Sequence, residues 1–137
     1  MRISMHKASA YLFGCMCGFI LACQPEKDQS IKEQSIEGRW ELERASVNGE
    51  GTDRLRNLYF VFLPDTSLQT NIMGSEQNFA YRFLEDNIIQ QSSDPQFSYR
   101  INEMTDSTMV METEIRQNLF TIFLSKVKPK VHTAPVN

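Results

Sequence analysis

The side chains of this sequence that could carry out acid–base chemistry are mainly carboxylates. Glu41 and Glu43 lie two residues apart, as do Glu112 and Glu114, and glycoside hydrolysis uses a pair of carboxylates. In a β-strand, residues two apart share one face, and the alternation of the sequence puts both pairs on the polar, solvent-facing side of their strands. Nothing in the sequence places either pair in a cleft, so we predict that the protein is not an enzyme.

Histidine and cysteine supply most zinc and copper ligands, and histidine is the commonest general base. The chain has two histidines and three cysteines. His6, Cys15 and Cys17 fall in the N-terminal 22 residues, and His132 lies in a Pro-containing tail. Cys23 is then the one thiol left, so we predict no internal disulfide, no metal and no cofactor.

The charge of the chain gives no indication of a nucleic-acid partner. Beyond residue 22 there are 12 basic and 17 acidic residues, a formal net charge of −5. Proteins that bind nucleic acid carry clustered Lys and Arg, and this sequence has no such cluster. We therefore predict no nucleic-acid binding.

The first 23 residues have the pattern of a secretory signal. Arg2 and Lys7 precede an apolar run over 8–22, which is too short to span a bilayer comfortably. Residues 20–23, Ile-Leu-Ala-Cys, resemble the lipobox of bacterial lipoproteins. That resemblance implies cleavage after residue 22 and acylation of Cys23, for example with palmitate, which would anchor the protein to a membrane. An ordinary signal peptide or a short anchor helix that ends in cysteine is the alternative.

Residues 23–35 are predicted to be the lipidated cysteine and a flexible tether, because they are polar with a single apolar residue after Cys23. Gln24 stands where an inner-membrane retention signal would place Asp, so we expect the outer membrane, with the protein facing the periplasm or the cell surface. Glu26 and Asp28 resemble the acidic export signal of surface lipoproteins in Bacteroidetes-type bacteria. A solvated linker is the alternative.

From residue 36 onward the sequence predicts an all-β domain, followed by a tail over 128–137. Short runs rich in aromatic and β-branched residues alternate with turn clusters, and no window keeps a helical period for three turns. The expected strands are eight: 36–47, 58–63, 67–73, 78–84, 87–91, 96–104, 107–115 and 119–127. The short turns between them can join only antiparallel neighbours, which gives a meander. Residues 48–57 form the longest connection, with a short helical turn over 53–56 as an option.

Alternation gives each expected strand one apolar face, and a sheet of this kind can bury that face by closing into a barrel. A sandwich is the main rival. Arg82 and Arg100 fall on outer faces; a register slip of one residue would turn both inward, where they could clamp an anionic ligand. The residues expected inside are Trp40, Phe60 or Tyr59, Phe79, Tyr81, Phe83, Phe97, Tyr99, Met109, Met111 and Phe120.

The first strand carries a recognisable motif. Gly38-Arg39-Trp40 resembles the Gly-x-Trp motif that opens the first strand of lipocalins and bacterial lipocalin-like domains, and the similarity extends over 36–127 through Phe60-Val61-Phe62, Phe79–Phe83 and Ser125-Lys126-Val127. The resemblance implies an eight-stranded antiparallel up-and-down barrel. It also implies that Trp40 closes the narrow end beside Gly38 and that a basic residue packs across it. Lys126 is the nearest candidate, with Lys128 as the alternate, where the family usually has Arg.

An eight-stranded barrel encloses either a filled core or one small ligand. A pocket would be apolar, would lie at the open end, and would use the hydroxyls of Tyr81 or Tyr99 with Met109 and Met111 as an adaptable wall; the same four residues are otherwise ordinary core. The resemblance implies a membrane-anchored, non-enzymatic protein that binds a small hydrophobic or amphipathic molecule in the barrel mouth. A filled barrel that acts through protein partners, in assembly, adhesion or inhibition, is the alternative.

Overall fold

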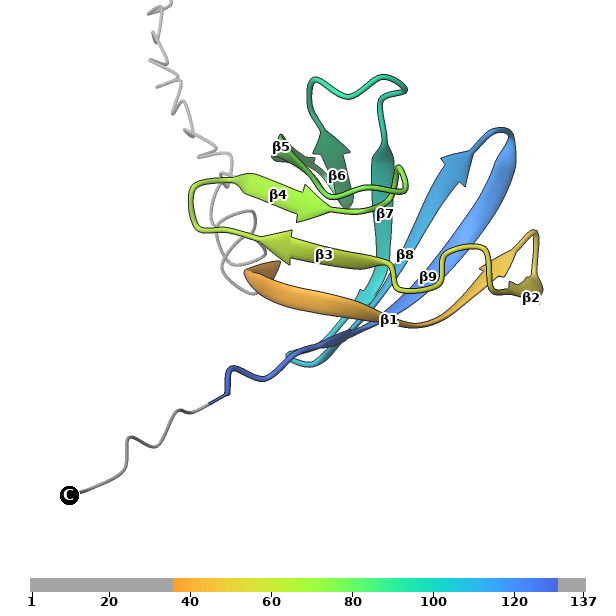
Figure 1. The fold of residues 1–137 in the computed structure, drawn as a ribbon, viewed down its shortest axis with the longest axis horizontal. Coiled ribbons are helices and arrows are strands. Elements are labelled where there is room, and N and C mark those ends of the chain that lie inside the picture. The colour runs from red at the N-terminus through yellow and green to blue at the C-terminus, as the bar shows by residue number, and fades with distance from the viewer. Residues whose placement is uncertain (1–35, 131–137) are drawn as a thin grey trace, which may run out of the picture.

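Nine antiparallel strands form one sheet in the computed structural model, which describes residues 36–130 (Figure 1). The predicted signal peptide, Cys23, the tether and residues 131–137 of the tail lie outside the described residues. Within residues 36–130, no helix is long and apolar enough to cross a membrane. The strands are β1 (Gly38–Val47), β2 (Glu50–Thr52), β3 (Tyr59–Phe62), β4 (Ser67–Thr70), β5 (Gln77–Leu84), β6 (Asn87–Gln90), β7 (Ser98–Met104), β8 (Thr108–Ile115) and β9 (Asn118–Lys126).

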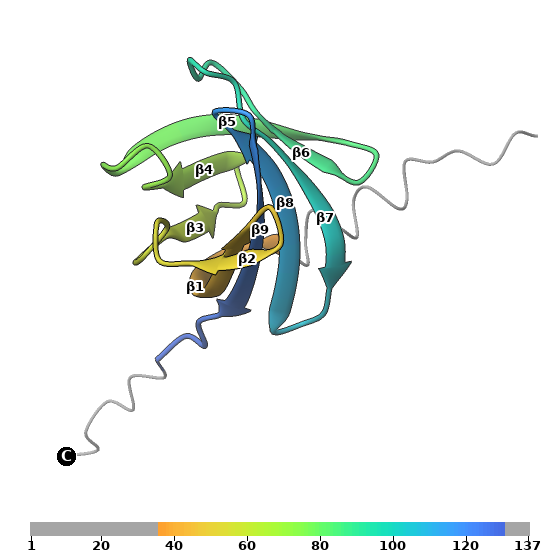
Figure 2. The same cartoon turned by 90° about the vertical axis from the view of Figure 1, so that its right-hand side faces the viewer.

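The sheet closes on itself through pairing of β1 with β9, from Trp40 opposite Lys126 to Val47 opposite Phe120. The order around the barrel is β1, then β3 to β9 in sequence, and every neighbouring pair is antiparallel. Figure 2 shows the strands wrapped around one axis. The predicted all-β class and the eight-stranded antiparallel meander barrel are confirmed, and the sandwich alternative is excluded.

Strand β2 is the ninth strand and lies within the segment that was predicted to be a connection. It pairs with the end of β1, with Val47 opposite Glu50, through the two-residue turn Asn48-Gly49. Both turn residues have positive φ, 48° and 87°, as a type I′ hairpin turn requires, and Asn-Gly is the preferred sequence for that turn. The helical turn over 53–56 is present as a hydrogen-bonded turn, in which the Arg56 amide donates to the Asp53 carbonyl over 3.1 Å.

A β-bulge in the middle of β1 changes which strand borders it. On the β9 side, Leu42 lies opposite Leu124 and Arg44 opposite Phe123, so Glu43 is the extra residue that bends the strand. On its other side, β1 pairs with β3 only from Gly38 to Glu41 and with β2 further along. A fork therefore opens in the outer wall between β1 and the segment 53–58.

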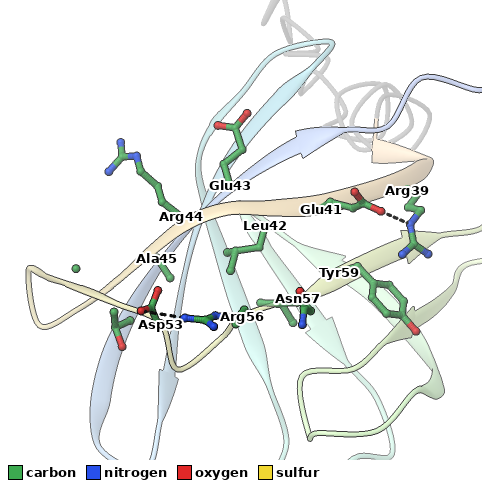
Figure 3. A pocket seen from close by; sticks show the side chains of 13 residues that line it. Arg39, Glu41, Leu42, Glu43, Arg44, Ala45, Asp53, Arg56, Asn57 and Tyr59 are labelled. Atoms are coloured by element: carbon green, nitrogen blue, oxygen red, sulfur yellow. Dashed lines mark hydrogen bonds and ion pairs between the residues drawn. The ribbon is translucent and has the colours of Figure 1, made fainter.

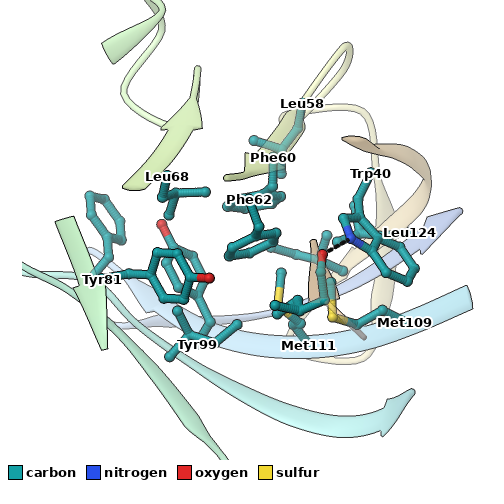
Figure 4. Close-up of a cluster of buried hydrophobic side chains, with 14 of the residues drawn as sticks. Trp40, Leu58, Phe60, Phe62, Leu68, Tyr81, Tyr99, Met109, Met111 and Leu124 are labelled. Atoms are coloured by element: carbon teal, nitrogen blue, oxygen red, sulfur yellow. Dashed lines mark hydrogen bonds between the residues drawn. The ribbon is translucent and has the colours of Figure 1, made fainter. Parts of the chain in front are cut away.

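The buried core confirms the predicted interior, decides between Phe60 and Tyr59, and corrects the expectation for Phe79. Phe60 points inward and Tyr59 does not, and Phe79 is only half-buried because its part of β5 pairs with β4 alone, near a barrel edge. Arg82 and Arg100 are exposed, so the register-slip alternative is wrong. Buried rings pack edge to face, for example Phe60 against Tyr99 with centroids 5.2 Å apart (Figure 4), a favoured aromatic geometry.

The two ends of the barrel follow from the strand directions. The start of β1, the end of β9 and the short turns after β3, β5 and β7 lie at one end, which we call the closed end. The β1–β2 turn, the segments 53–58, 71–76 and 91–97 and the β8–β9 turn lie at the other, which we call the mouth. The longer connections therefore gather at the mouth.

Candidate functional site

The three residues that the resemblance assigned to barrel closure lie together at the closed end. Trp40 is fully buried, and its indole Nε1 donates a hydrogen bond to the Ile36 carbonyl over 2.7 Å. The Lys126 Nζ lies 5.2 Å from the centroid of the Trp40 ring, within the range of a cation–π contact. Gly38 has a φ of +116°, and a Cβ there would stand 2.9 Å from Lys126 Cε. The positive φ therefore favours glycine at this position, and a larger residue would also displace the end of the Lys126 side chain.

The four residues predicted to contact a ligand lie in the packed core. Tyr81, Tyr99, Met109 and Met111 are at most 4% exposed, and none of them lines either cavity described below. The Tyr99 hydroxyl donates to Gln90 Oε1 over 2.8 Å, and burial raises the pKa of Tyr99 far above its ordinary value. Figure 4 shows these side chains packed among the other core residues.

A cavity of about 490 Å³ occupies the mouth of the barrel. Its wall is about half apolar and half polar, and Arg54, Glu114 and Arg116 at its rim are exposed, so the cavity opens to solvent through a charged rim. The apolar residues that line it are Leu55, Ile72, Met73, Phe97, Ile115 and Phe120. This arrangement can hold an apolar body while leaving a polar end in water.

The strands that form the mouth separate on the side of this cavity. Strands β7 and β8 are paired from Met104 opposite Met109 to Arg100 opposite Glu112, and their pairing extends no further toward the mouth. Residues 95–97 before β7 and 114–116 at the end of β8 both line the cavity. The cavity therefore reaches between the two strand ends as well as over the barrel axis.

A second cavity, of about 740 Å³, lies on the outer wall at the fork beside β1 (Figure 3). We call it the charged groove. Two ion pairs line this groove. Arg39 Nε lies 2.8 Å from Glu41 Oε1, and Arg56 Nη2 lies 3.2 Å from Asp53 Oδ2. Glu43 also lines this groove. The Glu41–Glu43 pair therefore does border a cavity, contrary to expectation, but Glu41 is occupied by its arginine and the groove is an exposed surface.

Metal binding finds no support in the part of the chain that the structure describes. No group of three or more His, Cys, Asp or Glu side chains there could hold a metal ion. The chemistry available at the mouth is instead apolar contact, with hydrogen bonding from a few buried polar groups.

No family model matches the chain, and a search of the curated proteins finds no match. The class that the structure defines is a closed eight-stranded antiparallel β-barrel with one sealed end and one hollow end.

The residues that line the mouth were not singled out from the sequence as ligand contacts. Ile115 continues the inward alternation of Met109 and Met111, and Ile72 continues that of Leu68. Ile115 is the last residue of β8, and Ile72 lies two residues beyond the end of β4, in the mouth segment 71–76. Nearness to a mouth connection was the available signal, because apolar residues at the ends of barrel strands line the opening.

Proposed function

We propose that this protein binds a small hydrophobic or amphipathic molecule in the mouth of its barrel. The observation that carries the proposal is the mouth cavity. Its volume of about 490 Å³ lies within the usual ~300–1,000 Å³ range of small-molecule sites. Apolar side chains line about half of its wall, and small-molecule sites combine such hydrophobic side chains with a few polar groups that orient the ligand.

The filled part of the barrel restricts where such a ligand binds. The aromatic and methionine side chains between Trp40 and Tyr99 are buried and in contact with one another, so a ligand is held above them. In this proposal the protein binds its ligand without catalysing a reaction. The barrel resembles a lipocalin because a tryptophan closes one end and the other end receives the ligand.

We also propose that the barrel is held at a membrane of the cell envelope, preferably the outer membrane, through acyl chains on Cys23. The support is the lipobox-like sequence Ile-Leu-Ala-Cys over 20–23. The chain enters β1 at the closed end. A tether attached there leaves the mouth on the opposite side of the barrel, available to a ligand. Labelled palmitate incorporated by the native chain and lost in Cys23→Ala is the expected result; equal labelling of both rejects the anchor.

The binding proposal is tested with the purified full chain, native mass spectrometry and the apolar fluorophore N-phenylnaphthylamine. Ile115→Trp fills the mouth cavity, and we expect it to weaken fluorophore binding at least about tenfold. Leu119→Trp adds the same ring on the outward face of β9, where Leu119 is 47% exposed, and this variant should bind the fluorophore normally. Absence of any copurified ligand together with no fluorophore binding by the native chain would reject the proposal.

A second candidate is a barrel that acts through a protein partner. It is favoured by the charged groove, which is larger than the mouth cavity, at about 740 Å³ against about 490 Å³. The Ile115→Trp variant distinguishes the two candidate functions. If this variant keeps its full cellular role, the protein acts through its outer surface and not through its mouth.

A further inference from the structure

The buried polar side chains of residues 36–130 all adjoin the mouth. They are Thr70, Gln90 and Thr113, with exposed fractions of 1%, 0% and 3%, and we call them the polar layer. Thr113 and Ile115 share the inward face of β8, and Thr70 ends β4 two residues before Ile72, which lies in the mouth segment 71–76. Ile72 and Ile115 line the cavity, so the polar layer adjoins apolar residues of the mouth.

Two atoms of the polar layer have no partner in the protein. The Thr70 hydroxyl donates to the Tyr59 carbonyl over 2.8 Å, and Gln90 Oε1 accepts from the Tyr99 hydroxyl. Gln90 Nε2 and Thr113 Oγ1 are buried without any hydrogen bond. Buried polar atoms are nearly always paired in native proteins, and leaving one unpaired destabilises the fold. The presence of two unpaired buried polar atoms close to one cavity therefore calls for a structural or functional explanation.

Both residues with unpaired groups neighbour residues that line the mouth cavity. The backbone amide of Gln90 donates a hydrogen bond to the Phe97 carbonyl over 3.0 Å. Thr113 lies opposite Phe120 in the β8–β9 register. Phe97 and Phe120 both line the cavity and are each 5% exposed. Gln90 and Thr113 are therefore each separated from the lining of the cavity by a single neighbouring residue.

We propose that the mouth ligand inserts an uncharged polar end, a carbonyl, ester or hydroxyl oxygen, that accepts hydrogen bonds from Gln90 Nε2 and Thr113 Oγ1. This inference rests on the proposed binding function and names the chemistry of its ligand. An amide and a hydroxyl both donate to such an oxygen. The apolar remainder of the ligand then lies against Ile72, Ile115 and the two phenylalanine rings.

We infer that the inserted end of the ligand is uncharged, because the described residues bury no charged side chain that could pair with it. None of the buried side chains among the described residues is ionised, and the arginines of the cavity, Arg54 and Arg116, stand at its exposed rim. An unpaired carboxylate at the depth of Gln90 would lose its hydration with no cation to replace it. Burial keeps the Tyr99 phenol protonated, so it supplies no charge either.

The test uses two ligands that differ by one group. Benzylacetone and butylbenzene share a skeleton, and the former has a ketone in place of a methylene. In displacement of N-phenylnaphthylamine from the purified full chain, we expect benzylacetone to bind about three- to tenfold more tightly, which corresponds to one or two net hydrogen bonds. The anion phenylpropanoate, of similar size, should bind more weakly than benzylacetone; tighter binding would contradict a neutral end.

Thr113→Val keeps the shape of the side chain and breaks no bond within the protein. We expect Thr113→Val to reduce the preference for benzylacetone at least about threefold and to leave the affinity for butylbenzene within about twofold of the native value. Thr113→Ser, which retains a hydroxyl, should restore the preference for benzylacetone. Gln90→Leu combined with Tyr99→Phe removes the other donor together with its partner and should act in the same way. Thr70→Val is the control, because its hydroxyl is already occupied, and it should keep the preference.

The outcomes separate the two proposals. If the native chain binds both ligands equally, or if Thr113→Val and the Gln90 variant keep the preference, the assignment of the polar layer is overturned while binding in the mouth stands. If neither ligand nor the fluorophore binds the native chain, the proposed function itself fails.

Discussion

The closed end and the mouth of this barrel are built from the same strands but satisfy their buried groups differently. At the closed end Trp40 donates to a carbonyl and Lys126 covers its ring. At the mouth the register of β7 and β8 ends at Arg100 and Glu112, and Gln90 and Thr113 keep unpaired polar atoms. From this comparison we infer that stability is concentrated at the closed end, and we propose that binding takes place at the mouth.

The largest expected effect is at the closed end. Trp40→Ala removes a fully buried ring and its hydrogen bond, and we expect it to lower the free energy of unfolding by about 3–5 kcal/mol. Trp40→Phe, which keeps most of the apolar volume, should lose clearly less. Urea unfolding followed by circular dichroism measures both, and a loss below about 1 kcal/mol for the alanine variant would contradict a sealing role.

A glycine pair separates backbone strain from the contact with Lys126. Gly38 and Gly49 both have positive φ, but only at Gly38 would a new Cβ meet another atom within 4 Å, the Lys126 Cε. We expect Gly49→Ala to cost about 1 kcal/mol and Gly38→Ala about 1–3 kcal/mol, because the lysine must also move from the Trp40 ring. Equal losses in thermal unfolding would show that the lysine contact is unimportant.

Two buried threonines at the mouth should respond in opposite directions when replaced by valine. Thr70→Val removes the hydrogen bond to the Tyr59 carbonyl and should destabilise the fold by about 1–2 kcal/mol. Thr113→Val removes an unpaired buried hydroxyl, so in ligand-free protein it should leave stability unchanged or raise it by up to about 1 kcal/mol. A destabilisation by Thr113→Val equal to that of Thr70→Val would mean that its hydroxyl has a structural partner.

The smallest effect is expected on the outer wall, between the two ends. Arg100 Nη2 lies 2.7 Å from Glu112 Oε2, with the arginine side chain 62% exposed. Because exposed ion pairs contribute little, Glu112→Gln should lower the free energy of unfolding by about 0.2–1 kcal/mol, and less in high salt. A loss of the size expected for Trp40→Ala would place stability in the wall and weaken the contrast between the ends.

The fold was predictable because its main determinant is local. Alternation shows which residues of a strand face inward, and it placed Trp40, Tyr81 and Phe120 correctly inside the barrel. Closure followed from the need to bury that face. Strand β2 was missed although its Asn48-Gly49 turn carries a strong hairpin signal, because the three strand residues after the turn, Glu50 to Thr52, have no apolar pattern.

The site was less predictable because facing inward and lining the mouth are different properties. Tyr99 and Ile115 both point inward, but only Ile115 lies at the open end. The level of a residue along the barrel axis depends on strand tilt and stagger, including the bulge at Glu43, and alternation does not contain that information. The polar layer was unpredictable for the same reason. Gln90 and Thr113 face inward, but the lack of hydrogen-bond partners for their polar atoms becomes apparent only when all strands are assembled.

The most direct test of the account is methyl nuclear magnetic resonance of the full chain with labelled isoleucine, leucine and methionine, titrated with benzylacetone. We predict saturable shifts of the Ile72, Ile115 and Leu55 methyl signals, which belong to the mouth. The Met109 methyl signal, buried near Trp40, should not move. Shifts confined to the charged groove, or no saturable shift at the mouth, would contradict the claim that the open end of this barrel is its binding site.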